Sequence, residues 1–472
     1  MIMKGYRIER DTLGEVRVPK GSYYGAQTQR AVENFPISNL RLQPEFIRAQ
    51  AIVKLAAARA NVDAGQLDPK IGNAIMQAAR EVMDGHFSNQ FVVDVFQAGA
   101  GTSQNMNMNE VLANRASEIL GGRLGEYRLV HPNDHVNMGQ STNDTIHTAI
   151  HISALIELQD RLLPALEQLV SAVREKEKEF DNIVKCGRTH LQDAVPMRLG
   201  QEFGGYASML EKNSRRLEDS SDGLAELAIG GTAVGTGLNA APHYRKRVIA
   251  AINELTGRRF RSARNLFEAM QSMDAVVECS GALRVLVTSL KKIADDLRLL
   301  QSGPRTGLGE IHFPPVQPGS SMMPGKVNPV LAEMLDMVCF HAMGNDAAVL
   351  HAAQAGQLEL NVMMPVIAYN LLQAIQVLSS GMNAFAAKCV RGIESDEDTC
   401  RYYAERSAAL ATALSPYIGY EKASDLAKES LEANIPIREL LITRNIMSKA
   451  DVDKILHIRG MTVDPEKLRR RK

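Results

Sequence analysis

The stretch "PGSSMMPGKVNP", residues 318 to 329, combines loop-forming residues with side chains that can bind an anion or move a proton. Its prolines and glycines exclude a helix or a central strand across it. The polar side chains that remain are two hydroxyls, an ammonium and an amide, which belong to Ser320, Ser321, Lys326 and Asn328. Both an ordinary surface connection and a loop that shapes a ligand site have this composition.

Three further stretches gather neutral hydrogen-bond donors instead of paired acids. They are "AGAGTSQNMNMNE" (98 to 110), "HPNDHVNMGQSTND" (131 to 144) and "GRTHLQDAVP" (187 to 196). They contain Thr102, Ser103, Ser141, Thr142, Asn143, Thr189 and His190. Hydroxyl, amide and backbone N–H donors satisfy carboxylate oxygens, and one ammonium adds charge. Together the four stretches predict a site for a small ligand that carries carboxylates.

Some of these residues also have purely structural interpretations. Ser141, Thr142 and Asn143 could cap the helix that follows them, and Asp144 would suit its first turn. Capping of this kind is compatible with ligand binding. His190 could instead be a hydrogen-bonded core histidine.

Patterns typical of metal and nucleotide sites are not found. His147 and His151 are one helical turn apart, but "HTAIH" lacks the glutamate of the HExxH zinc motif, so we do not expect a metal site there. "GGTAVGTGLN" lacks the GxGxxG order, and "PGKVNP" follows its lysine with valine. Neither segment predicts a phosphate cradle.

Composition indicates an ordinary soluble globular protein. The 472 residues are 45% hydrophobic and include 54 basic and 54 acidic side chains, which argues against a nucleic-acid or membrane partner. The five cysteines are scattered without a CxxC pair, as expected for reduced thiols. The start lacks the apolar core of a signal peptide, and no apolar run reaches about 18 residues. We therefore expect a cytoplasmic protein.

The elements that must position these side chains are mostly helices. After a mixed segment of about 45 residues, three apolar series step by three and four, which predicts long helices. The series are Val276, Cys279, Leu283, Leu286, Leu290, Ile293, Leu297 and Leu300; Leu155, Leu158, Leu162, Leu166, Leu169 and Val173; and Leu371, Ile375, Leu378, Met382 and Phe385. Strand-like alternation is scarce. The fold class is therefore all-α, and the bundle is expected to continue across subunits, although it could be self-contained.

The loop "GSSMMPGKVNP" closely resembles the signature GSSxMPxKxNP of the aspartase/fumarase superfamily. Further blocks resemble that family in order: "GTSQNMNMNEVLANRA", "NMGQSTND", "GRTHLQDAVPMRLGQE", "GTAVGTGLN" and "GQLELNVMMPV". They extend from "YYGAQTQRAVENFPI" to "TALSPYIGYEKA". The resemblance implies a three-domain subunit, here 1–142, 143–397 (the central long-helix bundle) and 398–472. It also implies a homotetramer in which three subunits form each active site.

Members of this family eliminate an amine or hydroxyl group from a succinyl skeleton to give fumarate. Removing a proton beside a carboxylate places a second negative charge on that carboxylate, so preorganised donors must stabilise the dianionic aci-carboxylate. Neutral donors supply this better than an acid pair would. No metal or organic cofactor is needed for this chemistry.

The resemblance also implies roles for individual residues. Ser320 would be the base that takes the C3 proton, activated by Lys326 or by adjacent backbone N–H groups. Lys326 and Asn328, with help from Ser321, would hold the α-carboxylate. The other carboxylate would be surrounded by Thr102, Ser141, Thr142, Thr189 and His190. Asn143, with Thr102 and His190, would lie near the leaving group, and Glu333 would orient the histidine.

The leaving group is either ammonia or water. Aspartases typically show AGTS and QSTND, as at residues 100–103 and 140–144 here, where fumarases usually carry SGTQ and QSSND. "HPND" and "GGTAVGTGLN" are more typical of fumarases, and Met138 and Met364 depart from common residues of the family. We expect an aspartase, with a fumarase as the alternative. A helical protein that has lost the chemistry would lack the loop serine, lysine or histidine, all of which are present.

Overall fold

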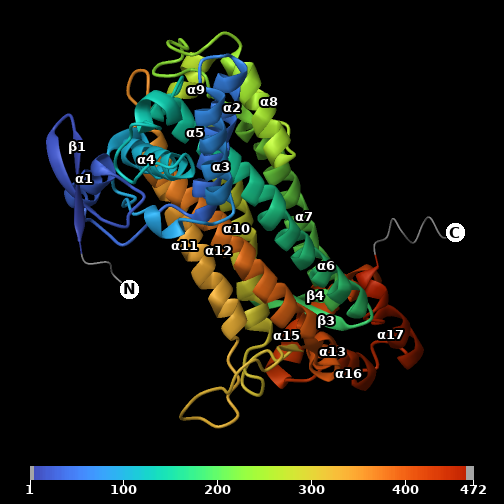
Figure 1. Cartoon of the computed structure of the whole chain (residues 1–472). Coiled ribbons are helices and arrows are strands. Elements are labelled where there is room, and N and C mark those ends of the chain that lie inside the picture. The colour runs from blue at the N-terminus through green and yellow to red at the C-terminus, as the bar shows by residue number, and fades with distance from the viewer. Residues whose placement is uncertain (1–4, 464–472) are drawn as a thin grey trace. The chain divides into compact units, whose positions relative to one another are not determined.

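The structure is a computed structural model that describes residues 5–463 of the chain. It is mainly helical, and the strands of the described residues form only two-stranded pairs (Figure 1). The predicted all-α class is thus confirmed. The longest helices are α7 (Leu199–Leu224), α10 (Asp274–Leu300), α11 (Val330–Ala353) and α12 (Met364–Lys388).

The chain divides into two compact units. Unit 1 comprises the residues up to Pro164, Arg215–Val287 and Phe340–Ser379, and unit 2 comprises the remainder. The boundary falls inside α7, α10, α11 and α12. The division into three domains that the resemblance implies stays a prediction.

Unit 1 begins with a hairpin and continues mostly as helices. Its elements are β1 (Tyr6–Asp11), β2 (Gly14–Pro19), α1 (Ala26–Asn34), α2 (Pro44–Asp63), α3 (Pro69–Met83), η1 (Ser88–Gln90), η2 (Gly99–Gly101), α4 (Thr102–Ile119), η3 (Pro132–Val136), α5 (Thr142–Glu157), η4 (Leu158–Leu162), β5 (Glu226–Leu227), α8 (Tyr244–Thr256), β6 (Arg261–Ser262) and α9 (Leu266–Gln271). β1 and β2 pair antiparallel, whereas β5 and β6 form a short parallel pair.

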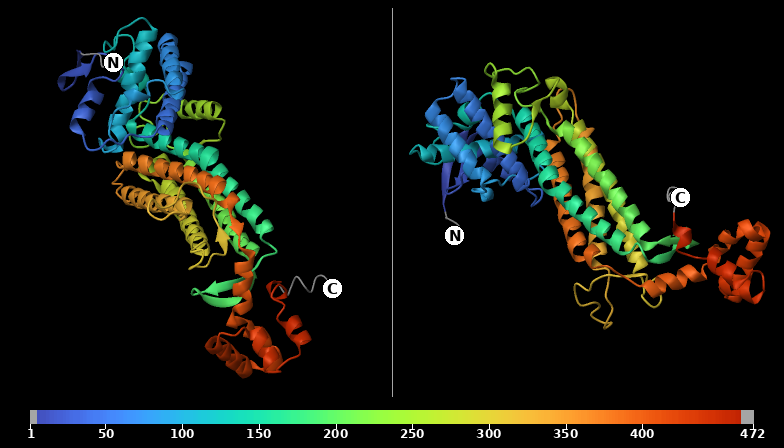
Figure 2. Two further views of the ribbon diagram at one scale, coloured as in Figure 1. Left: turned by 90° about the horizontal axis from the view of Figure 1, so that it is seen from below. Right: turned by 90° about the vertical axis from the view of Figure 1, so that its right-hand side faces the viewer.

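Unit 2 contains a second hairpin and the C-terminal helices. Its elements are α6 (Leu163–Glu179), β3 (Val184–Thr189), β4 (Gln192–Arg198), β7 (Ile311–His312), η5 (Val390–Gly392), β8 (Glu394–Ser395), α13 (Glu397–Arg406), η6 (Ala408–Leu414), α14 (Ser415–Ile418), α15 (Tyr420–Ala433), α16 (Ile437–Thr443), α17 (Lys449–Ile455) and η7 (Gly460–Thr462). The last helices, red in Figure 2, enclose their own apolar core, which includes Leu414, Ile437, Leu441 and Val452.

The three apolar series predicted from the sequence are all buried. No member of the series in α10 or in α12 is more than 5% exposed, and the same holds for the series from Leu155 to Val173. Each large side chain buried in this way contributes roughly 1.5–3 kcal/mol to folding. These faces therefore supply the main reason for the long helices.

The helix predicted around residues 155 to 173 is not uniform. A π-helical turn, η4, separates α5 from α6 at Leu158–Leu162. Such a turn accommodates an extra residue, so it shifts the helix face that follows it. Leu158 and Leu162 nevertheless stay buried, which explains why the apolar series passes through the turn without a visible break.

The N-terminal segment is held by one buried carboxylate. Glu110 of α4 accepts backbone hydrogen bonds from Gly25 at 2.8 Å, from Gln27 at 2.9 Å and from Thr28 at 3.1 Å. A helix leaves its first N–H groups without partners inside the helix, and a carboxylate suits their positive end. Glu110 therefore fixes the start of α1 against α4.

Two expectations from the sequence concern the cysteines and helices that could span a membrane. All five cysteines are free and buried. Within residues 5–463, no helix is both long enough and apolar enough to cross a bilayer.

Candidate functional site

The N-terminus of α5 carries the predicted residues Ser141, Thr142 and Asn143, and it is closed by a capping box. The Ser141 hydroxyl accepts a hydrogen bond from the backbone N–H of Asn143 at 3.2 Å. The backbone N–H of Ser141 donates to Asp144 Oδ1 at 2.9 Å. The capping interpretation is confirmed. Because Ser141 Oγ already accepts a bond, its own hydrogen remains able to donate to a ligand.

Asp144 joins α5 to the glycine-rich segment "GGTAVGTGLN". Its side chain is fully buried, and Oδ2 accepts hydrogen bonds from the backbone N–H groups of Gly230 and Thr232, both at 3.0 Å. Gly230 has a φ of +87°, which favours glycine, and a Cβ there would lie 2.8 Å from the Cβ of Arg245. Burial raises the pKa of Asp144 to about 6. The segment thus folds around a carboxylate of the protein itself.

Thr102 begins α4 directly after two residues with positive φ. Ala100 has a φ of 59° and Gly101 a φ of 78°. The backbone N–H of Ala100 donates to the carbonyl of Val362 at 2.7 Å. A Cβ on Gly101 would lie 3.2 Å from the side chain of Ile146, so only glycine allows α5 to approach this closely. These contacts fix the position at which α4 starts.

Asn105, almost one turn into α4, connects this helix to the start of α5. Its Nδ2 donates to Thr142 Oγ1 at 3.1 Å. The structure therefore brings the Thr102 end of α4 to the Thr142 end of α5. Two helix N-termini favour a negatively charged group. The Thr142 hydroxyl keeps its hydrogen to donate, whereas the Thr102 hydroxyl donates to the carbonyl of Gly99 at 3.1 Å.

In unit 2, Thr189 and His190 lie at the tip of the β3–β4 hairpin. Thr189 pairs with Gln192, so His190 and Leu191 form the two-residue turn. Both turn residues have positive φ, 53° and 58°, as the favoured hairpin turns require. Thr189 and His190 are exposed. The interpretation of His190 as a core histidine is therefore wrong.

Buried charges support the base of this hairpin. Glu310, which is 0% exposed, binds Arg188 at 2.9 Å and Lys185 at 3.1 Å. Burial lowers the pKa of Lys185, but the carboxylates of Glu202 and Glu310 outweigh it, and the net direction is upward. Removing one partner from such a buried group costs about 3–5 kcal/mol. The network thus gives the hairpin a rigid base.

The loop 318–329 contains neither helix nor strand, as predicted. Its neck is closed by a hydrogen bond from the backbone N–H of Ser320 to the carbonyl of Lys326 at 3.1 Å. A Cβ on Gly319 would lie 1.5 Å from that carbonyl oxygen, and Gly325 has a φ of +80°. Both glycines are therefore required by the closed neck.

Inside the loop, Ser320 Oγ accepts hydrogen bonds from two backbone N–H groups. They belong to Met322 at 3.2 Å and to Met323 at 3.1 Å. Hydrogen bonds of this kind favour the ionised form of the oxygen that accepts them. Lys326 Nζ donates instead to Asn328 Oδ1 at 2.9 Å. Of the two activators considered for Ser320, the backbone groups are thus the ones in contact with it.

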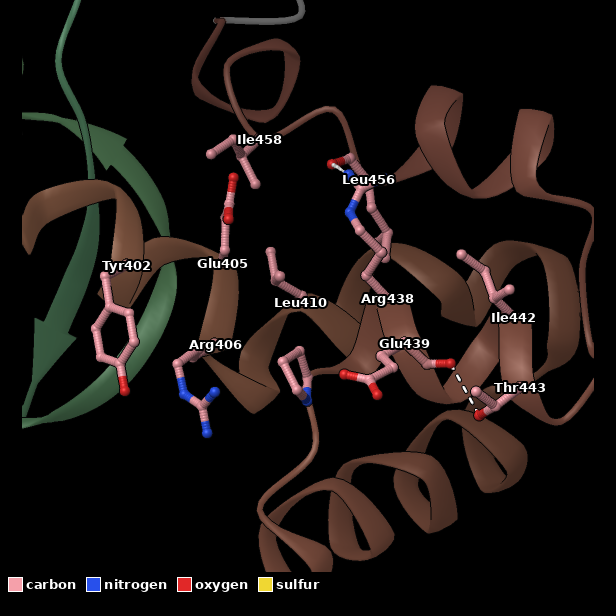
Figure 3. Close-up of a pocket in the computed structure, with 11 residues that line it drawn as sticks. Tyr402, Glu405, Arg406, Leu410, Arg438, Glu439, Ile442, Thr443, Leu456 and Ile458 are labelled. Carbon is pink, nitrogen blue, oxygen red and sulfur yellow. Dashed lines mark hydrogen bonds between the residues drawn. The ribbon is translucent and has the colours of Figure 1, made fainter. Parts of the chain in front are cut away.

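A cavity of about 420 Å³ adjoins the second arm of the loop. Lys326 and Asn328 line it, together with Arg298 and His312. Another cavity of about 420 Å³ lies among the C-terminal helices, between Tyr402, Glu405, Leu410 and Glu439 (Figure 3). It is lined by none of the predicted site residues.

The predicted site residues therefore fall into two groups. Unit 1 holds Thr102, Ser141, Thr142 and Asn143, and unit 2 holds Thr189, His190, Ser320, Ser321, Lys326, Asn328 and Glu333. Within the described part of this single chain, no hydrogen bond or ion pair joins Glu333 to His190. The roles that the resemblance implies for these residues stay predictions.

His147 and His151 are both buried in unit 1, with ring centroids 4.3 Å apart. His151 Nδ1 lies 2.8 Å from the carbonyl of Glu226, and His147 Nε2 lies 3.4 Å from the carbonyl of Ser272. Burial lowers the pKa of His151 to about 4 and lowers that of His147 as well. Over residues 5–463, no three His, Cys, Asp or Glu side chains are arranged to hold a metal.

A buried amide network lies behind the Thr142 hydroxyl and was not predicted from the sequence. Its segment "NMNMNE" belongs to the polar stretch 98 to 110, in which only Thr102 and Ser103 were predicted to bind a ligand. Asn105, Asn107 and Asn109 are at most 1% exposed. Asparagine at every second position of a helix that also carries buried methionines is the signal that could have found it, because buried amides need partners.

Two family models match the chain: Lyase over residues 14–344 and Fumarase C C-terminus over residues 410–463. Aspartate ammonia-lyase of Bacillus subtilis is 48% identical over 97% of this chain and 96% of its own length. Fumarate hydratase class II of Halobacterium salinarum is 52% identical over 97% of both chains. The chain belongs to the aspartase/fumarase superfamily.

Solved structures agree with this membership in the superfamily. A crystal structure described as fumarate lyase:delta crystallin from Brucella melitensis bound to cobalt is 46% identical, with a TM-score of 0.94. The match covers 97% of this chain and 100% of that one. The chain is thus a lyase-superfamily enzyme, and its relatives of both kinds have similar identity.

The histidine pair predicts a pH-dependent loss of stability. Because the imidazoles of the unfolded chain bind protons near pH 6.5 and the buried rings do not, the pair lowers the free energy of unfolding as the pH falls below about 6.5, whereas the raised pKa of Asp144, about 6, acts in the opposite direction. His151 should contribute about 2 kcal/mol of this loss between pH 7 and pH 5, and His147 should add to it in the same direction. Denaturant titrations at both pH values measure it.

His147→Leu should reduce the loss that the pair causes. His86→Leu replaces an exposed histidine and should leave the loss unchanged. A His147→Leu protein with the full wild-type loss would contradict the assignment.

Proposed function

We propose that the protein is an aspartate ammonia-lyase, which converts L-aspartate reversibly to fumarate and ammonia by anti elimination. The sequences "AGTS" and "QSTND" resemble those of aspartases, and they are the observation that supports ammonia as the leaving group. In the fold they lie at the starts of α4 and α5, where Asn105 links them. These residues are the ones proposed to lie nearest the substrate. They are therefore better evidence for the leaving group than overall sequence identity is.

In this proposal, Ser320 Oγ takes the C3 proton. The carboxylate next to C3 then becomes the aci-carboxylate dianion, and ammonia leaves from C2 with the electron pair of the broken bond. A serine is a weak base in water, and the N–H groups of Met322 and Met323 on Oγ support its activation. Lys326, Asn328 and Ser321 hold the α-carboxylate.

Donors from both units surround the dianion. Thr102, Ser141, Thr142, Thr189 and His190 donate to the aci-carboxylate, which is where preorganised donors lower the barrier most. Asn143 lies near the leaving group with Thr102 and His190, and Glu333 orients the histidine. Following the family resemblance, we place the site where three subunits of a homotetramer meet.

The surface of α11 supports this assembly. Met337, Met343 and Leu350 are 63%, 41% and 41% exposed, although α11 is one of the most apolar segments of the chain. Large exposed apolar faces on a long helix are typical of subunit interfaces. We therefore propose α11 as part of the tetramer core.

Fumarate hydratase is the second candidate. It is favoured by the sequence "HPND" and by the 52% identical hydratase of Halobacterium salinarum. The same base and the same carboxylate donors would serve it, with water as the leaving group. The positions that distinguish the two reactions in this comparison are Ala100, Ser103 and Thr142.

Fumarate formation from L-aspartate and from L-malate, followed by ultraviolet absorbance, tests the leaving group. We expect fumarate from aspartate and none from malate, because Ala100 offers no side-chain hydroxyl to the site. Fumarate from malate alone would make the protein a hydratase. Wild-type protein treated with heat serves as the blank for both substrates.

Ser320→Ala should lower turnover by at least about 10³-fold, since it removes the proposed base. Binding of succinate and the oligomeric state should be preserved, because Ser320 supports no core packing and exposed Met322 and Met323 can donate to water instead. Steady-state kinetics and calorimetry measure the two effects. Ser171→Ala, on an exposed part of α6, is the matched control, and near-normal turnover of Ser320→Ala would refute the base assignment.

The double variant Met343→Glu with Leu350→Glu should dissociate the tetramer, because two charges would be buried without partners. Sedimentation velocity measures the change, and turnover should be lost with the tetramer. Leu431→Glu provides the control, since Leu431 is 70% exposed on α15 outside the proposed core. A double variant that still sediments as a tetramer would place the interface elsewhere.

A further inference from the structure

Lys54 is a fully buried lysine on α2, close behind the unit 1 group of site residues. It is 0% exposed, and within residues 5–463 it forms no ion pair, although the charge of Asp144 acts on it. Its Nζ donates to Asn137 Oδ1 at 2.9 Å. Burial lowers the pKa of Lys54 to about 7, opposed by the charge of Asp144. Burying an ammonium costs free energy of folding, so we expect this lysine to have a function that an apolar side chain could not perform.

Asn137 transmits the orientation of this ammonium to α4. Its Oδ1 also accepts hydrogen bonds from Asn105 Nδ2 at 3.2 Å and from Asn109 Nδ2 at 3.3 Å. Its own Nδ2 donates to the carbonyl of Gln140 at 3.3 Å. An ammonium can only donate, so Lys54 fixes which end of the Asn137 amide faces it.

Asn105 connects the Asn137 amide to the predicted site residue Thr142. Its Nδ2 points toward both Asn137 Oδ1 and Thr142 Oγ1, and its Oδ1 accepts from Thr145 Oγ1 at 3.4 Å. Thr142 Oγ1 therefore accepts from the protein. Its hydroxyl hydrogen remains to donate outward, which is the role that a carboxylate ligand needs.

We infer that Lys54 is a positioning residue that acts through Asn137 and Asn105 to hold the Thr142 hydroxyl as a donor to the substrate carboxylate. The inference rests on the proposed function, because that function places a carboxylate at Thr142. In its protonated form, Lys54 also adds a positive charge behind the donors, and a low-dielectric interior screens that charge little. A purely structural role is a weaker explanation, because an apolar side chain would fill the same space without the cost of burying a charge.

Lys54→Met keeps the length of the side chain and removes the charge. We expect the dissociation constant of succinate, a dicarboxylate that does not react, to rise about 10-fold to 100-fold. kcat should fall by at least a similar factor, because the Thr142 hydroxyl is proposed to donate to the charge that develops in the transition state. The melting temperature should not fall, since the cost of a buried charge is removed. Lys176→Met is the matched control, because Lys176 is 6% exposed and binds the carbonyl of Ile393 in unit 2.

A double-mutant cycle with Thr142→Val separates positioning from a general effect on the fold. If Lys54 acts through Thr142, Lys54→Met should weaken succinate binding less than 3-fold once the hydroxyl is gone, well below its effect in the wild type. The same cycle with Thr189→Val should be additive, because Thr189 belongs to the hairpin of unit 2. Additive effects of Lys54→Met and Thr142→Val would overturn the inference.

Two further outcomes are decided by the same experiments. If Lys54→Met does not fold, Asn137→Leu breaks the same chain of amides and should show the same coupling to Thr142→Val. A wild type that binds succinate but converts neither aspartate nor malate would refute the proposed function, and the cycle would still test the positioning role. If the wild type does not bind succinate but forms fumarate from aspartate, the proposed function stands and the same cycle is measured on kcat/KM for aspartate.

Discussion

The carboxylate of Asp144 is the constraint on which the unit 1 part of the site depends. It holds the backbone N–H of Ser141 through one oxygen and those of Gly230 and Thr232 through the other. This arrangement fixes the helix start that presents Ser141, Thr142 and Asn143. Because each N–H is satisfied by a buried group of the protein, the hydroxyls above them are left for a ligand. The glycine-rich segment is shaped by the same carboxylate.

A site that stabilises a dianion must bind the transition state more strongly than the ground state. Cations close to the substrate would bind it strongly in the ground state, whereas donors that strengthen as charge develops favour the transition state. Lys326 is proposed to bind the α-carboxylate directly, but around the carboxylate that becomes the dianion the chain places hydroxyls and amides in front and charges behind. Lys54 lies behind Thr142, and the Lys185, Arg188 and Glu310 network lies at the base of the hairpin that carries His190. Around the proposed dianion, the rigid charged supports are thus separated from the hydroxyl donors.

Much of the fold could be predicted from the sequence, because burial leaves a periodic pattern. The series in α10 and α12 were found residue by residue, and the prolines and glycines of the loop 318–329 excluded regular structure. The π-helical turn at Leu158 was missed because its apolar residues stay in step. His190 was ambiguous because a single histidine carries no pattern. The Lys54 network could not be found, since its members are distant in sequence and only the fold brings them together.

The exposed positions of the catalytic candidates connect catalysis to assembly. In a single chain, Thr189 and His190 lie at an exposed hairpin tip and Lys326 on an exposed loop. Stabilising an aci-carboxylate needs a site from which water is excluded, because water weakens every donor it competes with. Exposed donors can meet that need only if another surface covers them. The proposed tetramer supplies such a surface through α11, whose apolar residues also need cover. The same association would bury the α11 face and exclude water from the active site. A subunit alone would therefore keep its fold but lose its activity.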